Sequence, residues 1–253
     1  MKKNNLYPLQ PIFEHNDYIF IFCPVAGAVS HVFHSWNNIE NKWMNMYCYL
    51  YPGHDLRMKE AYKTDIASLA NELAETIQST EWSQKKIILG GHSMGSQVAF
   101  ETCRVLEQQG VTVSALILSG CHAPHLTGLR HLTHLNDAQF VQQLMEIGGG
   151  SPEVLQDKDL LALFMPMLRA DFMATELYQR QQANAFKIMT PTLLIHADQD
   201  KEVSLDDILA WKSWLGGVKE HIVVSGDHFH VTLRPQQFLA VIQNFLFAQL
   251  TIN

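Results

Sequence analysis

A glycine-flanked serine motif constrains the fold of this chain more than any other feature. The pentapeptide Gly91–Gly95, with Ser93 at its centre, follows the apolar run 87–90 and precedes a helix-patterned stretch over 97–109. Strand, sharp turn and helix in this order are typical of a nucleophile elbow, which exposes the serine on a strained turn. Glycine is required at both ends because a side chain there would collide with the neighbouring strand or helix. The helix N-terminus directs unpaired N–H groups at a developing oxyanion, so the motif predicts acyl transfer at Ser93.

The other groups of a catalytic triad follow Ser93 in a recognisable order. By itself, the pentapeptide is also compatible with a glycine-rich turn and a serine helix cap. In an α/β-hydrolase, however, an acid and then a histidine come after the nucleophile, each following a strand. The runs 191–196 and 220–225 indicate two buried strands, and they are followed by a pair of aspartates and a pair of histidines. Because parallel strands end at one edge of a sheet, these groups can converge on the serine.

Asp200 is the predicted triad acid. It fits the usual hydrolase spacing, in which a small residue precedes the aspartate by three positions and valine follows it by three, here Ala197 and Val203. The alternative, Asp198, is expected to cap the turn through its own backbone, as short polar side chains commonly do.

His228 is the predicted base. It lies nearest the end of the preceding strand, whereas His230 comes two residues later and would share its side only if the chain stayed extended. The pattern of the fold also favours His228. Ser93, Asp200 and His228 therefore form the expected triad.

Strand-like and helix-like segments alternate along most of the chain. The pattern predicts strands at 18–23, 46–51, 87–90, 114–119, 191–196 and 220–225, and helices at about 66–77, 97–109, 205–215 and 235–249. This alternation implies a mostly parallel central sheet with helices on both faces. At this length we expect a single α/β-hydrolase domain over 1–253.

Between 120 and about 188 the alternation stops, and helix-compatible runs surround the break Gly148–Gly150. We expect a helical lid insertion at about 121–188 over the mouth of the site. The glycine run is either a hinge or an ordinary loop. The four methionines of the insertion could line an adaptable acyl pocket or simply pack the lid against the body. They are Met145, Met165, Met167 and Met173.

Composition and residue spacing argue against several classes of function. The net charge of −7 argues against partners such as nucleic acid or an anionic membrane. The four cysteines have no paired spacing and lie in or beside apolar segments, which favours small buried residues over disulfides or metal ligands. Three histidine pairs, at 122 and 125, 131 and 134, and 228 and 230, are close enough to suggest a metal, but no acidic ligand matches their spacing.

No apolar segment of signal-peptide length follows the N-terminus. The run 18–29 is too short to span a bilayer and is broken by Pro24. We therefore expect a protein of the reducing cytoplasm.

Several longer segments match one family of proteins nearly end to end. They are Phe22–Ala28 with Trp36 after it, Tyr51–Arg57, Gly91–Gly95 with Phe100 and Glu101 after it, Ser119–Leu126, Gly148–Leu155 and Leu168–Phe172. With them the chain resembles the stand-alone type II thioesterases of nonribosomal peptide and polyketide assembly lines. The segments after the elbow discriminate best, because other α/β-hydrolases do not generally carry them.

Four positions depart from the pattern of that family. Val25 replaces an aromatic residue, Ala28 replaces a glycine, Ser96 stands where glycine or alanine is frequent, and His54 stands where arginine is common. None of these departures removes a catalytic group. We expect any effect of these departures to fall on the shape of the pocket and on the contacts with a carrier protein.

The resemblance implies hydrolysis of acyl thioesters held on the phosphopantetheine arm of carrier proteins. The task in the family is to clear mis-primed or stalled acyl groups, with carrier domains of a synthetase as partners and no metal or organic cofactor. The resemblance also implies an oxyanion hole made by the backbone N–H groups of Met94 and Ala26. We expect a monomer that binds neither nucleic acid nor membrane.

Two other classes of function stay open at this point. One is a hydrolase of the same fold that acts on small-molecule esters or acyl-CoA. The other is a non-catalytic α/β-hydrolase used as a binding protein, against which the intact triad argues. The sequence does not name the acyl chain or the assembly line.

Overall fold

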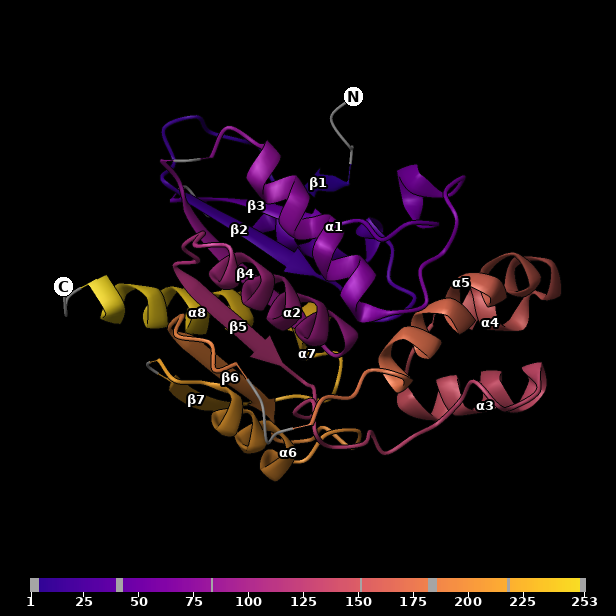
Figure 1. The fold of residues 1–253 in the computed structure, drawn as a ribbon. Coiled ribbons are helices and arrows are strands. Elements are labelled where there is room, and N and C mark those ends of the chain that lie inside the picture. The colour runs from indigo at the N-terminus through magenta and orange to yellow at the C-terminus, as the bar shows by residue number, and fades with distance from the viewer. Residues whose placement is uncertain are drawn as a thin grey trace.

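The computed structural model of the protein describes residues 5–39, 43–82, 84–150, 152–181, 186–217 and 219–250, and a seven-stranded sheet forms its centre (Figure 1). In space the strands follow the order β1-β3-β2-β4-β5-β6-β7. All neighbours pair in parallel except β1, which is antiparallel to β3. The strands are β1 (Leu6–Pro8), β2 (Tyr18–Cys23), β3 (Met44–Tyr49), β4 (Lys86–His92), β5 (Ala115–Ser119), β6 (Thr192–Ala197) and β7 (Lys219–Val224). The predicted mostly parallel sheet is confirmed.

The central strands are apolar throughout because both of their faces are covered. On β2, Ile19 and Ile21 belong to one buried cluster, and Phe20 and Phe22 belong to the cluster on the opposite face. Successive side chains of a strand point to opposite faces, so a continuous apolar run fills two cores at once.

Two layers of helices cover the sheet, as expected. One cluster joins the sheet to α1 (Ile66–Ser79), α2 (Met94–Gln108), α6 (Leu205–Leu209) and the 3-10 helix η4 (Ala210–Trp214). The other joins it to the 3-10 helix η1 (Ser30–Asn38) and to α8 (Pro235–Leu250), which follows the short α7 (His230–Leu233). Figure 1 shows α1 and α2 in front of the sheet and α8 behind it.

The structure differs from the predicted elements at several ends. Strand β3 begins at Met44 and ends at Tyr49, two residues earlier than predicted, and α2 begins at Met94 instead of 97. Asp65 is the N-cap of α1, because its side chain accepts from Ser68 N–H. The predicted helix 205–215 is α-helical only to Leu209 and continues as η4.

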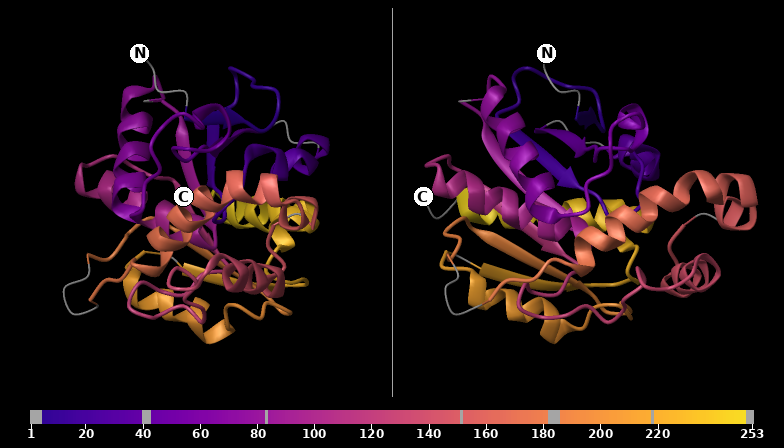
Figure 2. Two further views of the ribbon diagram at one scale, coloured as in Figure 1. Left: turned by 90° about the vertical axis from the view of Figure 1, so that its right-hand side faces the viewer. Right: turned by 45° about the vertical axis from the view of Figure 1, so that its right-hand side comes forward.

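Three helices of the expected insertion lie beyond the carboxyl ends of the strands (Figures 1 and 2). They are α3 (Asp137–Ile147), α4 (Pro152–Gln156) and α5 (Lys158–Glu176). They share a small hydrophobic cluster of their own, formed by Leu132, Phe140, Leu144, Met165 and Leu168. Ser151, part of one family-like segment, lies outside the described residues.

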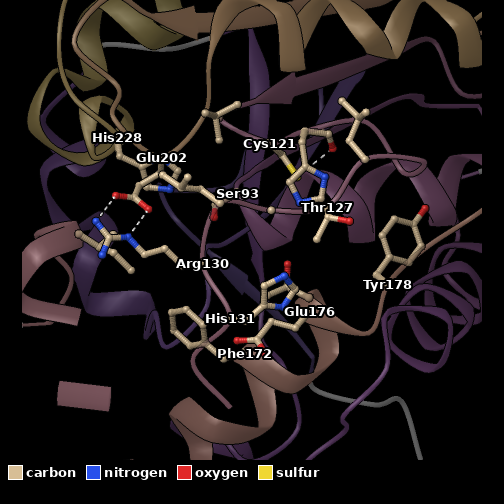
Figure 3. Close-up of a pocket in the computed structure, with 18 of the residues that line it drawn as sticks. Ser93, Cys121, Thr127, Arg130, His131, Phe172, Glu176, Tyr178, Glu202 and His228 are labelled. Carbon is tan, nitrogen blue, oxygen red and sulfur yellow. Dashed lines mark hydrogen bonds and ion pairs between the residues drawn. The ribbon is translucent and has the colours of Figure 1, made fainter. Parts of the chain in front are cut away.

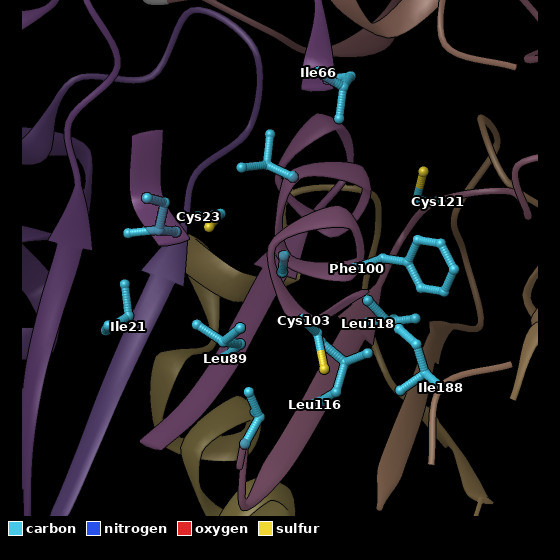
Figure 4. Packing of buried hydrophobic residues seen from close by; sticks show 14 of the residues in the cluster. Ile21, Cys23, Ile66, Leu89, Phe100, Cys103, Leu116, Leu118, Cys121 and Ile188 are labelled. Carbon is cyan, nitrogen blue, oxygen red and sulfur yellow. The ribbon is translucent and has the colours of Figure 1, made fainter. Parts of the chain in front are cut away.

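All four cysteines are buried and free, as the sequence predicts. Cys23, Cys103 and Cys121 lie in the cluster beneath α1 and α2 (Figure 4), and Cys48 lies in the opposite one. None of the helices in the described ranges is both long enough and apolar enough to cross a membrane.

Candidate active site

Ser93 lies on a strained turn between β4 and α2. Its backbone has φ 54° and ψ −127°, a conformation that L-residues rarely adopt. A Cβ on Gly91 would lie 2.0 Å from the Gly95 carbonyl oxygen, and a Cβ on Gly95 would lie 1.9 Å from the Cys23 carbonyl oxygen. Glycine is therefore required at both positions, which confirms the reason that the sequence suggested.

Asp200 and His228 form a buried pair at the same edge of the sheet. His228 Nδ1 donates to Asp200 Oδ2 at 2.9 Å, and the Asp200 side chain is fully buried. The other oxygen of Asp200 accepts from the N–H groups of Glu202 (2.8 Å) and Val203 (3.2 Å). Burial alone would raise the pKa of Asp200, but the hydrogen bond and charge of His228 and these two N–H groups outweigh it and lower the pKa.

The two competing residues have other partners. Asp198 is exposed and accepts from Gly226 N–H at 3.0 Å, so it links the loops after β6 and β7. The expectation that Asp198 caps its own turn is thus wrong. His230 Nε2 lies 3.1 Å from Ser119 Oγ instead of facing Asp200.

A chain of hydrogen bonds behind His228 holds its backbone. The His228 carbonyl oxygen accepts from His92 Nε2 at 2.5 Å, so His92 carries its proton on that nitrogen. The other nitrogen, Nδ1, accepts from Ser119 Oγ at 2.9 Å, and Ser119 Oγ in turn accepts from His230. Burial lowers the pKa of both His92 and His230, so this chain is made of neutral rings. No pattern in the sequence indicated it.

Ser93 and His228 line one cavity of about 120 Å³. In Figure 3, Ser93 lies between His228 and Glu202 on one side and Cys121 on the other. Among the described residues, the structure records no hydrogen bond between Ser93 Oγ and His228 Nε2. Such contacts are often long in free enzymes and tighten when substrate binds.

Residues of the insertion form one wall of this cavity. Ile147 comes from α3, and Phe172, Thr175 and Glu176 come from α5. The lining residues from the described part of the chain include none of the four methionines of the insertion. Met165 packs in the cluster of the insertion, and Met145 and Met173 are exposed. This cavity therefore does not support the four methionines as its lining, and their role in an acyl pocket stays a prediction.

Arg130 joins the beginning of the insertion to the loop of the triad acid. It donates to both oxygens of Glu202, at 2.8 and 3.0 Å, as the dashed lines in Figure 3 show. Glu202 N–H in turn binds Asp200. No local sequence pattern indicates Arg130 or Glu202, since these positions are 72 residues apart.

The two residues expected to form an oxyanion hole lie at the ends of neighbouring elements. Met94 is the first residue of α2, so its N–H has no acceptor within the helix. Ala26 lies in the loop after β2, and within the described ranges its N–H makes no hydrogen bond to another backbone group. The next residue, Gly27, has φ +74° and donates its N–H to Asp171 Oδ2 of α5 at 2.7 Å.

The histidine pairs do not converge on a shared centre. His228 and His230 bind Asp200 and Ser119, respectively, and His125 accepts from Trp214. Within the described ranges, no three histidine, cysteine, aspartate or glutamate side chains are grouped to hold a metal ion.

The sheet, the serine elbow and the insertion over the strand ends define an α/β-hydrolase. Within this class the chain belongs to the thioesterase family, because the profile of the thioesterase domain matches residues 18–246. It is 38% identical to a protein of Vibrio anguillarum named as a probable anguibactin biosynthesis thioesterase, AngT, over 90% of this chain and 92% of that protein.

Solved structures of similar proteins have the same fold. YbtT, a type II thioesterase from the yersiniabactin pathway, is 38% identical with a TM-score of 0.91, covering 96% of this chain and 98% of that one. BorB, a type II thioesterase from the borrelidin cluster, is 26% identical with a TM-score of 0.83, covering 95% and 97%.

Proposed function

We propose that this chain is a type II thioesterase that removes acyl groups from the phosphopantetheine arm of carrier proteins. The observation that carries the proposal is the buried Asp200–His228 pair, which shares one cavity with Ser93 on its strained elbow. Two relatives that cover at least 90% of this chain support it by name: AngT is a probable anguibactin biosynthesis thioesterase, and YbtT is a type II thioesterase of an NRPS/PKS biosynthetic pathway.

Ser93 is the proposed nucleophile. Its oxygen attacks the thioester carbonyl carbon while His228 Nε2 accepts the hydroxyl proton, which gives a tetrahedral oxyanion. Asp200 holds the proton on His228 Nδ1 and stabilises the imidazolium that forms. The C–S bond then breaks, the thiol of the arm leaves with the proton from His228, and the acyl group stays on Ser93.

Water completes the reaction by the same route. His228 takes a proton from water, whose oxygen attacks the acyl-enzyme, and returns it to Ser93 Oγ as the free acid leaves. The N–H groups of Met94 and Ala26 are the proposed donors to the oxyanion in both steps. A thiolate is a good leaving group, and no metal or organic cofactor takes part in this scheme.

The carrier-bound nature of the substrate can be tested with one acyl group on two thiols. Hydrolysis of the acyl group on a carrier protein should have a kcat/KM at least about tenfold higher than on free pantetheine, because contacts with the carrier position the arm. Equal kcat/KM values would contradict a carrier-bound substrate and would favour an acyl-CoA or small-ester hydrolase.

A second experiment separates a hydrolase from a binding protein. A fluorophosphonate should label the wild type at Ser93, as located by mass spectrometry, and should leave Ser93→Ala unlabelled. An unlabelled wild type would favour a non-catalytic binding protein.

A further inference from the structure

Asp171 extends from the insertion and binds the loop that carries Ala26. Its Oδ2 accepts from Gly27 N–H at 2.7 Å and lies 3.0 Å from His54 Nε2. Asp171 and His54 are each only 2% exposed, so water screens this contact little. One carboxylate of α5 thus joins two segments of the body, the loop after β2 and the loop after β3.

The hydrogen bonds of His54 define its charge. Its Nδ1 lies 3.1 Å from the Pro52 carbonyl oxygen, and its Nε2 faces the Asp171 carboxylate. Both partners only accept, so both ring nitrogens must carry a proton, and the ring is an imidazolium. The electrostatics agree: burial would lower the pKa of His54, but Asp171, Pro52 and Asp55 together raise it above 6.5.

The groups around His54 leave Asp171 as its main ionic partner. Asp55 lies next to it in the same loop, and its carboxylate accepts from Ser30 N–H. Arg57 points away, toward Glu60 and Glu72. Tyr51 packs edge-on against the His54 ring at a centroid distance of 5.6 Å and donates its hydroxyl to the Pro24 carbonyl oxygen. The loop 24–29 has no titratable side chain.

Helix α5 also packs directly on the loop at Gly27. A Cβ on Gly27 would lie 2.4 Å from Leu168 Cδ2, so the helix occupies the space where a side chain would be. The Gly27 N–H belongs to the peptide unit that follows Ala26, so its hydrogen bond restricts the orientation of Ala26 itself. The position of α5 and the direction of the Ala26 N–H are therefore coupled.

We propose that Asp171 and protonated His54 are positioning residues. By holding the Gly27 N–H they orient Ala26, so that its own N–H is directed for oxyanion binding only while α5 is seated on the body. This inference rests on the proposed function. It makes the oxyanion hole complete only beneath a closed insertion. The coupling also makes the oxyanion hole sensitive to the charge of His54. This residue is not part of the triad, so its titration is separate from that of His228.

The direction of the pH effect follows from the raised pKa of His54. A histidine whose pKa is raised on folding contributes its full stabilisation below the ordinary value of 6.5 and loses it as pH rises through the raised pKa. Neutral His54 can keep only one of its two hydrogen bonds and leaves Asp171 as an uncompensated buried charge. We therefore expect kcat to fall about tenfold on the alkaline side.

Three variants test the proposal through kcat, KM and pH profile. Asp171→Asn should lower kcat about tenfold or more with KM changed less than about twofold, because the defect lies in oxyanion stabilisation. The control is Asp159→Asn, an exposed aspartate of the same helix. His54→Arg, charged at every pH, should remove the alkaline fall, and His54→Gln should show the low alkaline rate at every pH.

Two results would overturn the proposal: a kcat for Asp171→Asn equal to that of Asp159→Asn, or an alkaline fall in His54→Gln as large as in the wild type. If Asp171→Asn does not fold, as judged by circular dichroism, the pH profiles of His54→Arg and His54→Gln test the proposal. The rate of Ser93 labelling by a fluorophosphonate can replace kcat as the measured quantity, so the variants and their pH dependence can also be compared without a thioester. A wild type that is labelled but hydrolyses no thioester contradicts the proposed function alone.

Discussion

Two hydrogen bonds fix His228, one on its ring and one on its backbone. Asp200 accepts a hydrogen bond from Nδ1–H, which leaves Nε2 unprotonated in the neutral ring. His92 donates to the His228 carbonyl oxygen from behind. A general base must hold its unprotonated nitrogen toward the nucleophile, so both bonds support the role that we propose for His228.

Substitutions of the proposed triad should abolish turnover to different degrees. Ser93→Ala loses the nucleophile and His228→Ala loses the base, and each should lower kcat about a millionfold. Asp200→Asn should lower kcat about ten-thousandfold, since an amide favours the wrong tautomer of His228. Steady-state hydrolysis of an acyl thioester measures all three losses.

Asp198→Asn is the matched control for Asp200→Asn. Asparagine keeps an oxygen that can accept from Gly226 N–H, so kcat should stay within about threefold of the wild type. A larger loss in Asp198→Asn than in Asp200→Asn would mean that the triad acid is Asp198.

The buried histidines should make the fold sensitive to acid. Burial lowers the pKa of His230 from 6.5 to about 4, and His228 acts in the same direction. Between these values the unfolded chain binds a proton that the folded chain does not, so stability is retained above pH 6.5 and lost as pH falls. The free energy of unfolding should drop on the order of 1 kcal/mol per pH unit in this range.

Urea denaturation at pH 7 and pH 5 tests this dependence. His230→Gln has no titrating ring but an amide that can still donate to Ser119, so its free energy of unfolding should change less between the two pH values. An equal change in the wild type and the variant would show that His230 does not cause the acid sensitivity.

The sequence predicted the candidate triad because Ser93, Asp200 and His228 each follow a strand with a strong apolar pattern. Asp171 and His54 could not be paired in this way. They are 117 positions apart, and each has ordinary neighbours. His54 stood out in the sequence only as a departure from the arginine common in the family, and in the structure it faces the buried Asp171 carboxylate.

At the scale of elements, α5 is anchored to the body through its second half. Thr175 donates to Gln97 at 2.8 Å, and just after the helix Tyr178 donates to Glu101 at 2.6 Å. Asp171 binds the loop after β2. The first half has exposed Leu160 and Leu163, and Pro166 removes one hydrogen bond from the middle of the helix.

This asymmetry predicts a gradient of hydrogen exchange along α5. Amides of 160–165 should exchange faster than those of 168–176, and both should exchange faster than the amides of β4 and β6. Exchange followed by mass spectrometry measures the three groups together. Exchange in 160–165 as slow as in the strands would show that the insertion is a rigid part of the core.

The glycine run after α3 can be tested with a pair of variants. Gly149 N–H donates to the Leu144 carbonyl oxygen at 2.9 Å, a bond that Gly149→Pro removes and the control Gly149→Ala keeps. Proline should therefore change turnover of a carrier-bound acyl group more than turnover of a small activated ester, which needs little opening. Equal losses on both substrates would contradict a role of the glycine run in opening the insertion. That role stays a prediction.

Helix and strand periods predicted the large elements but not the small ones. Strand β1 has three residues and is defined by its pairing with β3, which no local period reveals. Helix η1 has 3-10 geometry and an internal kink at Phe33, so its residues lack a regular 3.6-residue pattern. Neither element contributes a residue to the candidate triad, so missing them left the functional prediction unchanged.

In the molecule as a whole, the candidate catalytic residues lie together at one edge of the sheet. The loop after β2 carries Ala26, Ser93 follows directly after β4, and the loops after β6 and β7 carry Asp200 and His228. Parallel pairing brings these carboxyl ends together, so segments far apart in sequence meet there. Strand alternation was therefore sufficient to predict where a site would form, although the order of the strands was not predicted.

The most direct test of the account follows the mass of an acylated carrier protein during incubation with the enzyme. Wild-type protein should convert the acyl-phosphopantetheinyl carrier to the free-thiol form, and Ser93→Ala at equal concentration should leave the acyl mass unchanged. A carrier that keeps its acyl group in the presence of the wild type, or loses it equally fast with Ser93→Ala, would contradict a serine thioesterase acting at this site.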